Sequence, residues 1–539
     1  FTNISNFETL IGGDGAITMV LGAEYAAAGF VTHTEHDNGN TDAVNITYGS
    51  GVTTDQTYNM KTSSTTITAT GMTGDLTVAA IEGDILTADT LTGGSGSDTL
   101  NVTFSGTAAT SGDTDGITSF ENFKSATDHN GGFTFLDANF VSNNFTVNAE
   151  SVTTATNTFT VDASAEDDST MTYTGSAGID TVTGTDTTAS GDTISTGAAA
   201  DVITGGRGPD TITGGAGADV FTYTAVNQST GSERDSILDF TSGTDKIAVT
   251  IDQSSSNSGV TIDATVQTAR AGTSLIQENM SGSIGQTFYD TTNSRVIVNN
   301  NADALVTTLD YQIGVNAAAT ATSTIAAVDM QYTVTGGAGA DTIVVDGGAD
   351  VVVGGAGVDK ITITDTTAAA DKVTITVGAS SIDYITGFSA GGGATNDNLL
   401  APDATHAWLA VDTTNVDGVV GLGTGASLKA AEASNTDATV VTVSANVTAN
   451  TFDGLEAGTT SEGTMESAVI TAVGKTGGLA TGDIILMFVD DNEHTGVFKV
   501  TSGDQTTDDA LAAAEFEIMA VLKGVADATS IAAADILFA

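Results

Sequence analysis

The chain has 539 residues and a formal net charge of −54, from 67 acidic and 13 basic side chains. This charge excludes ordinary nucleic-acid binding, which needs a basic surface, and it disfavours docking on anionic lipid. Hydrophobic residues make up 40% of the chain and cysteine is absent, so we expect a folded protein without disulfides or thiolate metal sites. A folded chain with so many carboxylates repels itself unless cations neutralise it, and a divalent metal is the first candidate. No apolar run is long enough to span a membrane as a helix.

Residues 1–165 are interpreted as an N-terminal β-rich region. Short runs such as 65–70 and 145–149 alternate between apolar and polar residues, which is the pattern of half-buried strands. The phrase at 145–149 returns at 159–163, and such echoes favour a stacked or solenoidal β architecture over a closed globule. His33 and His36 have a metal-like spacing, but the polar residues that follow favour a solvated loop.

Two segments repeat every nine residues, with Asp at a fixed position and an apolar residue two positions later. The first lies in region 166–250, interpreted as a β-roll with an exit strand, and the second lies in region 331–400, interpreted in the same way. The Asp and apolar residues pair as Asp192 with Ile194, Asp201 with Ile203, Asp210 with Ile212, Asp219 with Phe221, Asp341 with Ile343, Asp350 with Val352, and Asp359 with Ile361. A single unit of the same kind, at 93–101, is either a calcium turn or an ordinary turn.

The nine-residue spacing has a direct structural meaning. Glycines turn the chain tightly, because they take backbone angles closed to other residues, and three residues then form a short strand. Two units complete one coil of a parallel β-roll, so Asp192 should lie near Asp210, Asp201 near Asp219, and Asp341 near Asp359. Carboxylate and carbonyl oxygens that converge without nitrogen or sulfur form a calcium site. Asp180 and Asp371, outside the arrays, either cap them or are ordinary loop acids.

The units at 205–213, 214–222, 336–344 and 354–362 resemble the RTX nonapeptide, Gly-Gly-x-Gly-x-Asp-x-apolar-x, of type I-secreted bacterial proteins. The units at 196–204 and 345–353 are degenerate. The phrases 235–247 and 381–388 also resemble family usage after a roll. The resemblance implies that several calcium ions are held by Asp192, Asp201, Gly205, Gly206, Gly208, Asp210, Gly214, Gly215, Gly217, Asp219, Asp245, Gly336, Gly337, Gly339, Asp341, Asp350, Gly354, Gly355, Gly357 and Asp359.

No catalytic motif accompanies the arrays. The chain has neither a His-Glu-x-x-His zinc motif nor a Gly-x-Ser-x-Gly nucleophile elbow, and acid pairs such as Asp490 and Asp491 are expected by chance in so acidic a chain. We therefore expect no enzyme. Region 251–330 is interpreted as intervening β structure. Region 401–539 is interpreted as a β domain with a hairpin formed by 484–490 and 496–500. Segment 508–522 is the best helical pattern, although its latter half fits a strand equally well, and the chain's end resembles a type I secretion region.

We therefore expect an all-β chain in which parallel β-roll segments lie within an elongated, multi-domain β-solenoid or β-sandwich. Such chains most resemble bacterial surface-layer proteins. The resemblance implies an extracellular, cell-surface structural protein that assembles with copies of itself into a layer or filament when calcium binds, with cell-surface polysaccharide as a further partner. Two alternatives stay open: a calcium-dependent adhesin or carbohydrate-binding module, and a secreted RTX hydrolase or lyase.

Overall fold

The computed structural model covers the 539-residue chain. It describes residues 9–11, 16–35, 43–61, 64–106, 114–140, 144–231, 233–256, 260–267, 284–290, 292–300, 310–315, 325–364, 369–375, 382–390, 397–401, 419–422, 440–443, 451–457, 464–465, 467–469, 484–491, 493–501, 516–526, 528–531 and 536–538.

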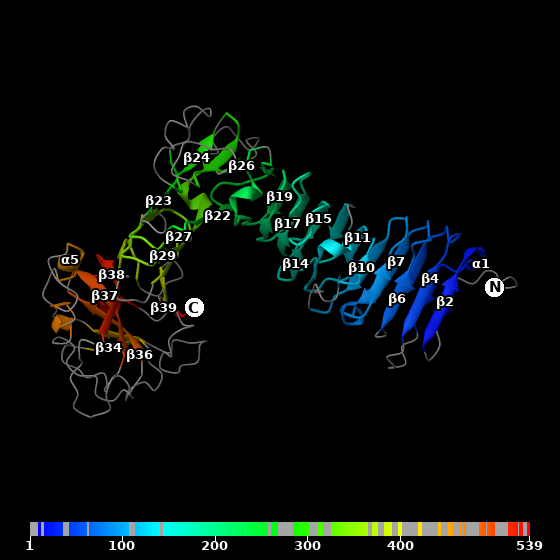
Figure 1. Ribbon diagram of the computed structural model, residues 1–539, viewed down its shortest axis with the longest axis horizontal. Coiled ribbons are helices and arrows are strands. Elements are labelled where there is room, and N and C mark those ends of the chain that lie inside the picture. Colours follow the sequence, from blue (N-terminus) through cyan, green and yellow to red (C-terminus); the bar gives the residue numbers. More distant parts are fainter. Residues whose placement is uncertain are drawn as a thin grey trace, which may run out of the picture.

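The N-terminal half is a two-sheet solenoid in which successive strands alternate between facing sheets (Figure 1). Sheet A, in spatial order, contains β1 (Thr9–Ile11), β3 (Thr32–Thr34), β5 (Gln56–Asn59), β7 (Leu76–Ile81), β9 (Thr99–Thr103), β11 (Asn122–Ser125), β13 (Phe145–Asn148), β15 (Met171–Ser176), β17 (Thr193–Ala198), β19 (Thr211–Ala216), β21 (Ser236–Ile237), β26 (Tyr311–Val315), β25 (Arg295–Val298) and β24 (Thr287–Asp290). Sheet B contains β10 (Ile117–Thr118), β8 (Thr90–Thr92), β6 (Thr65–Thr68), β4 (Val44–Tyr48) and β2 (Ile17–Leu21). The strands pair in parallel except where β24, β25 and β26 form an antiparallel end to sheet A.

A single sheet continues from the first array into the second. Sheet C contains β12 (Gly131–Thr134), β14 (Thr158–Asp162), β16 (Ile179–Thr183), β18 (Val202–Thr204), β20 (Val220–Tyr223), β22 (Lys246–Asp252), β27 (Met330–Gly337), β29 (Val351–Gly355), β31 (Lys372–Thr374), β33 (Asn398–Ala401) and β39 (Ile536–Phe538). The junction is the parallel pairing of β22 with β27, where the body in Figure 1 bends. The two arrays therefore share one continuous hydrogen-bonded sheet.

Sheet D accompanies the second array. It contains β23 (Thr261–Ala264), β28 (Thr342–Val345), β30 (Lys360–Ile363), β32 (Asp383–Thr386), β38 (Phe516–Lys523), β37 (His494–Thr501), β36 (Ile484–Asp490), β35 (Val440–Val443) and β34 (Val419–Leu422). The helices are short: α1 (Ala23–Ala27), α5 (Thr451–Glu456), and the 3-10 turns η1 (Glu82–Asp84), η2 (Asp137–Asn139), η3 (Val226–Gln228), η4 (Ala327–Asp329) and η6 (Ala528–Ser530). No helix in the described ranges has both the length and the apolar character needed to cross a membrane.

The register confirms that two nine-residue units complete one coil. Thr193 on β17 pairs with Thr211 on β19, and Val202 on β18 pairs with Val220 on β20. In the second roll Thr342 pairs with Lys360. Each pair lies two units apart, so equivalent turns of successive coils lie against each other along the edges of the roll.

The core lies between the facing sheets. The repeat residues predicted to point inward are all buried: Ile194, Ile203, Ile212, Phe221, Ile343, Val352 and Ile361. Nearer the N-terminus the coils are longer and the space is filled by phenylalanine rings packed edge to face, such as Phe123 against Phe133 and Phe135. Alternation places polar residues outside, so the all-β, parallel-roll fold class predicted from the sequence is confirmed.

The C-terminal hairpin is confirmed, because β36 and β37 pair antiparallel with Asp490 opposite Thr495. Of segment 508–522, the described part is strand β38, which pairs with β32 of the second roll; residues 508–515 lie outside the described residues. Sheet A continues across the predicted boundary at residue 165, because β13 pairs with β15. Sheet C continues across the predicted region 251–330, because β22 pairs with β27. The five-region division itself stays a prediction.

Candidate calcium ladders

Aspartates immediately before, or at the start of, the roll strands form four ladders along the edges. The first ladder is Asp192, Asp210 and Asp235; the second is Asp180, Asp201, Asp219 and Asp245; the third is Asp350, Asp371 and Asp397; the fourth is Asp341, Asp359 and Asp383. All of these side chains are buried. Because equivalent strands of successive coils pair in register, the aspartates at their starts lie against one another along the edge.

The first ladder shows the repeating contact. The backbone N–H of Asp192 donates to Oδ1 of Asp210 at 2.7 Å, and the N–H of Asp210 donates to Oδ1 of Asp235 at 3.0 Å. In each pair, one carboxylate oxygen therefore accepts a hydrogen bond from the backbone of the preceding coil. Oδ2 of Asp210 is buried and has no hydrogen-bond partner in the described part of the chain.

The other ladders repeat this geometry. In the second, the N–H of Asp201 donates to Oδ1 of Asp219 at 3.1 Å. In the fourth, the N–H of Asp341 donates to Oδ1 of Asp359 at 2.8 Å, while Oδ2 of Asp341 has no partner among the described residues. In the third, the N–H of Asp350 donates to Oδ1 of Asp371 at 2.7 Å. The neighbours predicted from the repeat spacing are thus confirmed.

The glycines make room for these carboxylates. A Cβ on Gly205, the first residue of its turn, would overlap Oδ2 of Asp210, and a Cβ on Gly336 would overlap Oδ2 of Asp341. Gly208 has a φ of 100° and faces backbone carbonyls of the preceding coil. Because glycine has no side chain, carboxylate and carbonyl oxygens can approach one another at these turns.

Burial makes the ladders electrostatically unfavourable on their own. Desolvation raises the pKa of Asp192 and of Asp219 to about 6, although backbone hydrogen bonds oppose the change. Burial also raises the pKa of Asp180 to about 7. For Asp210, burial first and then the charges of Asp235 and Asp192 raise the pKa to about 10. The ladders therefore need either protons or cations.

Calcium fits these ladders better than other metals. The candidate ligands are all oxygens, Oδ2 of Asp210 and Asp341 lacks a partner in the described part, and the glycine turns keep the edge open. Hard cations that accept many oxygens in variable geometry are of the calcium type. Bound calcium would supply the positive charge that lets adjacent coils keep their carboxylates ionised.

The predicted site residues lie together on these edges. The predicted Asp residues are all ladder members, and the predicted glycines lie at the ends of β19, β27 and β29 or in turns after β18, β19, β27 and β29. Their role as calcium ligands stays a prediction. Of the two acids left open, Asp180 donates its N–H to Asp201, and Asp371 accepts from Asp350, so both belong to ladders.

Three ladder members are not among the site residues predicted from the nine-residue repeat: Asp235, Asp383 and Asp397. They lie 24 to 26 residues from their ladder neighbours, so the nine-residue period does not find them. A shorter pattern would have done so: each begins an Asp-x-apolar triplet, ending in Ile237, Ile385 and Leu399.

The solvated-loop interpretation is wrong for His33. This residue lies on β3, is fully buried, and packs on Tyr58 with ring centroids 5.0 Å apart. Burial lowers the pKa of His33 to about 4, so the ring stays neutral. His36 lies outside the described residues. The alternating pattern of the neighbouring strands extends through His33, which is why it faces the core.

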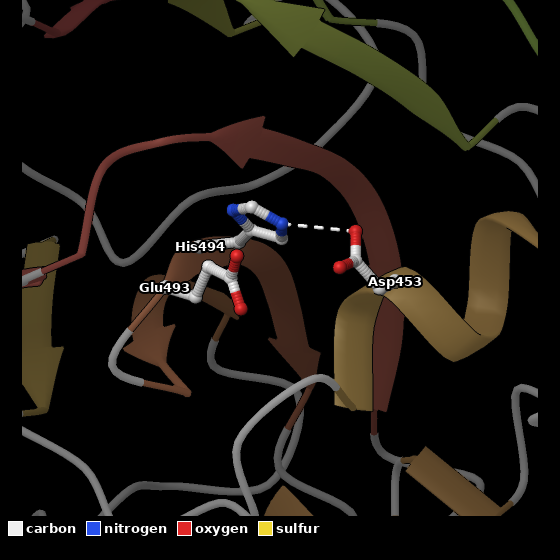
Figure 2. A group of neighbouring side chains, drawn as sticks. All are labelled: Asp453, Glu493 and His494. Atoms are coloured by element: carbon white, nitrogen blue, oxygen red, sulfur yellow. Dashed lines mark hydrogen bonds and ion pairs between the residues drawn. The ribbon is translucent and has the colours of Figure 1, made fainter.

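Asp453, Glu493 and His494 form a separate cluster, between α5 and the start of β37 in sheet D (Figure 2). The N–H of Gly524 donates to Nδ1 of His494 at 2.9 Å, so the ring proton lies on Nε2, which donates to Oδ1 of Asp453 at 2.9 Å. An imidazole bound in this way has no lone pair left for a metal or for general-base catalysis. Lys523 also contacts Glu456 at 2.6 Å, so the cluster fastens α5 to the sheet.

Comparison with known families agrees with the geometry. The family model described as peptidase M10 serralysin C terminal matches residues 23–313, which is more than half of the chain. The model of the RTX calcium-binding nonapeptide repeat, in four copies, matches residues 333–361. A search of curated proteins found no match. The first match covers the first and second ladders, and the second match covers Asp341, Asp350 and Asp359.

Proposed function

The chain belongs to the peptidase M10 serralysin C-terminal family and is a secreted, calcium-binding RTX protein, and from this premise we propose that it is a structural subunit. Calcium drives it to assemble with copies of itself into a surface layer or an extracellular filament on the cell that secretes it. Its main partner is a second copy of the chain, and cell-surface polysaccharide is a further partner.

The observation that carries this proposal is the continuity of sheet C. Because β22 pairs with β27 over six residues, from Ile247 opposite Met330 to Asp252 opposite Thr335, the two rolls form one elongated body. His494 contributes to this body by linking α5 to sheet D through Asp453. A long, continuous sheet suits a structural subunit, because it offers neighbouring copies an extended surface to bind.

The surface of the solenoid supports association through cations. Outward positions on the strands are mostly uncharged, such as Thr66 and Thr68 on β6 and Asn101 on β9. The large exposed apolar residues in the described part are Val20, Val31, Ile81, Val202, Leu238 and Val358, which are scattered along the chain. With a net charge of −54, copies repel each other over a range of about 10 Å at 0.1 M salt. Calcium removes this repulsion and can join carboxylates of two chains, whereas sodium only screens it.

The same chemistry provides the switch for export. Where calcium is scarce, the buried ladders disfavour folding, so the chain stays extended. Outside the cell, millimolar calcium binds the folded rolls and its binding free energy becomes folding free energy.

The test is assembly of the purified full chain. After chelation, the protein is returned to calcium, magnesium or sodium at matched ionic strength and followed by light scattering and negative-stain electron microscopy. Ordered sheets, tubes or filaments are expected with calcium but not with magnesium or sodium. Calcium-saturated protein that stays monomeric at high concentration contradicts the proposal.

The family match favours a second candidate, the non-catalytic secretion and structural part of a secreted peptidase. In that case calcium folds the rolls without ordered assembly. Calcium-loaded chain that folds, stays monomeric and leaves casein and polysaccharides intact favours this second candidate. Cleavage of either substrate instead favours a secreted hydrolase.

A further inference from the structure

A separate cluster of three carboxylates lies ahead of the nonapeptide arrays. Asp137 in η2, after β12, and Glu166 and Asp168, after β14, each place one carboxylate oxygen within 4.8 Å of the other two. Strands β12 and β14 pair in parallel, from Gly131 opposite Phe159 to Thr134 opposite Asp162, so the two turns belong to successive coils. The residues come together although about thirty positions separate them in the sequence.

The cluster lies on the edge that leads into the first ladder. The backbone N–H of Asp186, in the turn after β16, donates to the carbonyl oxygen of Glu166 at 2.7 Å. That same turn ends at Asp192, the first member of the ladder. The edge therefore runs without interruption from the cluster to the nonapeptide turns.

Glu166 gives the cluster a feature that a surface group of acids lacks. Its side chain is fully buried, and Oε1 accepts the backbone N–H groups of Asp168 at 3.0 Å and Ser169 at 2.8 Å. These two bonds fix the orientation of the carboxylate. Oε2 is buried and has no hydrogen-bond partner among the described residues. A buried carboxylate oxygen left in this way costs free energy unless a cation satisfies it.

We propose that Asp137, Glu166 and Asp168 bind one calcium ion that joins two coils of the solenoid before the first array begins. Calcium–oxygen distances of about 2.3–2.6 Å place ligands on opposite sides of an ion about 5 Å apart, which agrees with the spacing of the three oxygens. Magnesium, with bonds of about 2.0–2.1 Å and a strict octahedral shell, fits a rigidly held Glu166 less well. Asp137 and Asp168 are exposed, so water completes the shell.

This site extends the row of ions beyond the segments that carry the glycine-rich repeat. Residues 131–169 contain no Gly-Gly-x-Gly-x-Asp unit. The ion clamps the turn of the β12 coil to that of the β14 coil, so the longer coils of the N-terminal solenoid respond to calcium along with the array.

The test compares charge-matched variants of the full chain. Glu166→Gln keeps an acceptor for the two backbone N–H groups but removes the charge, and Asp137→Asn alters an exposed ligand in the other coil. Asp167→Asn is the matched control, because it removes the same charge from an exposed neighbour outside the cluster. Bound calcium is counted by native mass spectrometry, and hydrogen exchange of peptides covering 135–140 and 163–170 is measured with and without calcium.

We expect Glu166→Gln and Asp137→Asn each to lose one bound calcium and the calcium-dependent protection of both peptides, while Asp167→Asn behaves as the wild type. Equal calcium counts in all four proteins, or protection of both peptides that does not change with calcium, overturns the proposal. If Glu166→Gln does not fold, the exposed Asp137→Asn decides, because its side chain lies outside the core. The result is independent of whether the protein assembles.

Discussion

Without calcium, the first roll should lose stability as the pH rises, which is opposite to the behaviour of most acidic proteins. The pKa values of Asp192 and Asp219 are raised by burial to about 6 and that of Asp180 to about 7, from an ordinary value near 3.8. A carboxyl group whose pKa is higher in the fold than in the unfolded chain binds its proton more tightly when folded. Its stabilising effect is therefore complete below about pH 4 and is lost as the pH rises to about 7.

The magnitude is large compared with the stability of a domain. A tenfold change in proton affinity is worth about 1.4 kcal/mol, so keeping Asp192 or Asp219 in the fold above pH 7 costs about 3 kcal/mol each, and Asp180 about 4 kcal/mol. These three groups together cost about 10 kcal/mol, whereas a domain is stable by about 5–15 kcal/mol. Burial and the charges of Asp235 and Asp192 also raise the pKa of Asp210, which adds to the cost. Calcium replaces the protons and should remove the pH dependence.

The assay is urea unfolding of the full chain at about pH 5 and about pH 8, after exhaustive chelation and again in millimolar calcium. Far-UV circular dichroism follows β structure, and limited proteolysis reports on segment 175–250. The chelated protein should resist urea and protease better at the lower pH, and calcium should raise the resistance mainly at the higher pH. A chelated roll that is equally stable, or more stable, at the higher pH would refute the reasoning.

Three further results are expected. Asp210→Asn keeps the Oδ1 acceptor but removes a charged ligand, so it should raise the calcium concentration at the midpoint of roll folding about tenfold or more, while stabilising the chelated roll at about pH 8. The control Glu493→Gln changes an exposed acid of the C-terminal region and should leave the calcium titration unchanged. Identical titrations for the two variants would reject the ladder assignment. Ala199 has a φ of 79°, which glycine adopts more easily, so Ala199→Gly should raise the free energy of unfolding by about 1 kcal/mol in urea melts, whereas the same change at the neighbouring Ala200 should lower it. Magnesium at equal concentration should restore little β structure after chelation, because it gives up its bound water reluctantly. A circular dichroism spectrum in magnesium equal to that in calcium would contradict the assignment of the ladders as calcium sites.

The sequence alone was sufficient to predict the roll and its metal, because both depend on the residues within a nine-residue unit. Nine residues make one turn and one strand, so the positions of Asp201, Ile203 and their equivalents follow from the period, and the parallel register between coils follows from two such units. The inward position of the apolar residues, the stacking of Asp192 on Asp210, and an all-oxygen calcium chemistry were all predicted from this pattern.

Only the tertiary structure decided which residues meet across turns of unequal length. Asp235, Asp383 and Asp397 join their ladders through turns that insert extra residues, which breaks the nine-residue period while the strand register is kept. In the same way, Asp137 meets Glu166 because coil stacking, rather than sequence spacing, determines which turns are neighbours. The pairing of β22 with β27 bridges residues 253–329, which is possible because loop closure costs little more for a long loop than for a short one. A period in the sequence therefore specifies the coil, and the hydrogen-bonded register between coils specifies the sites.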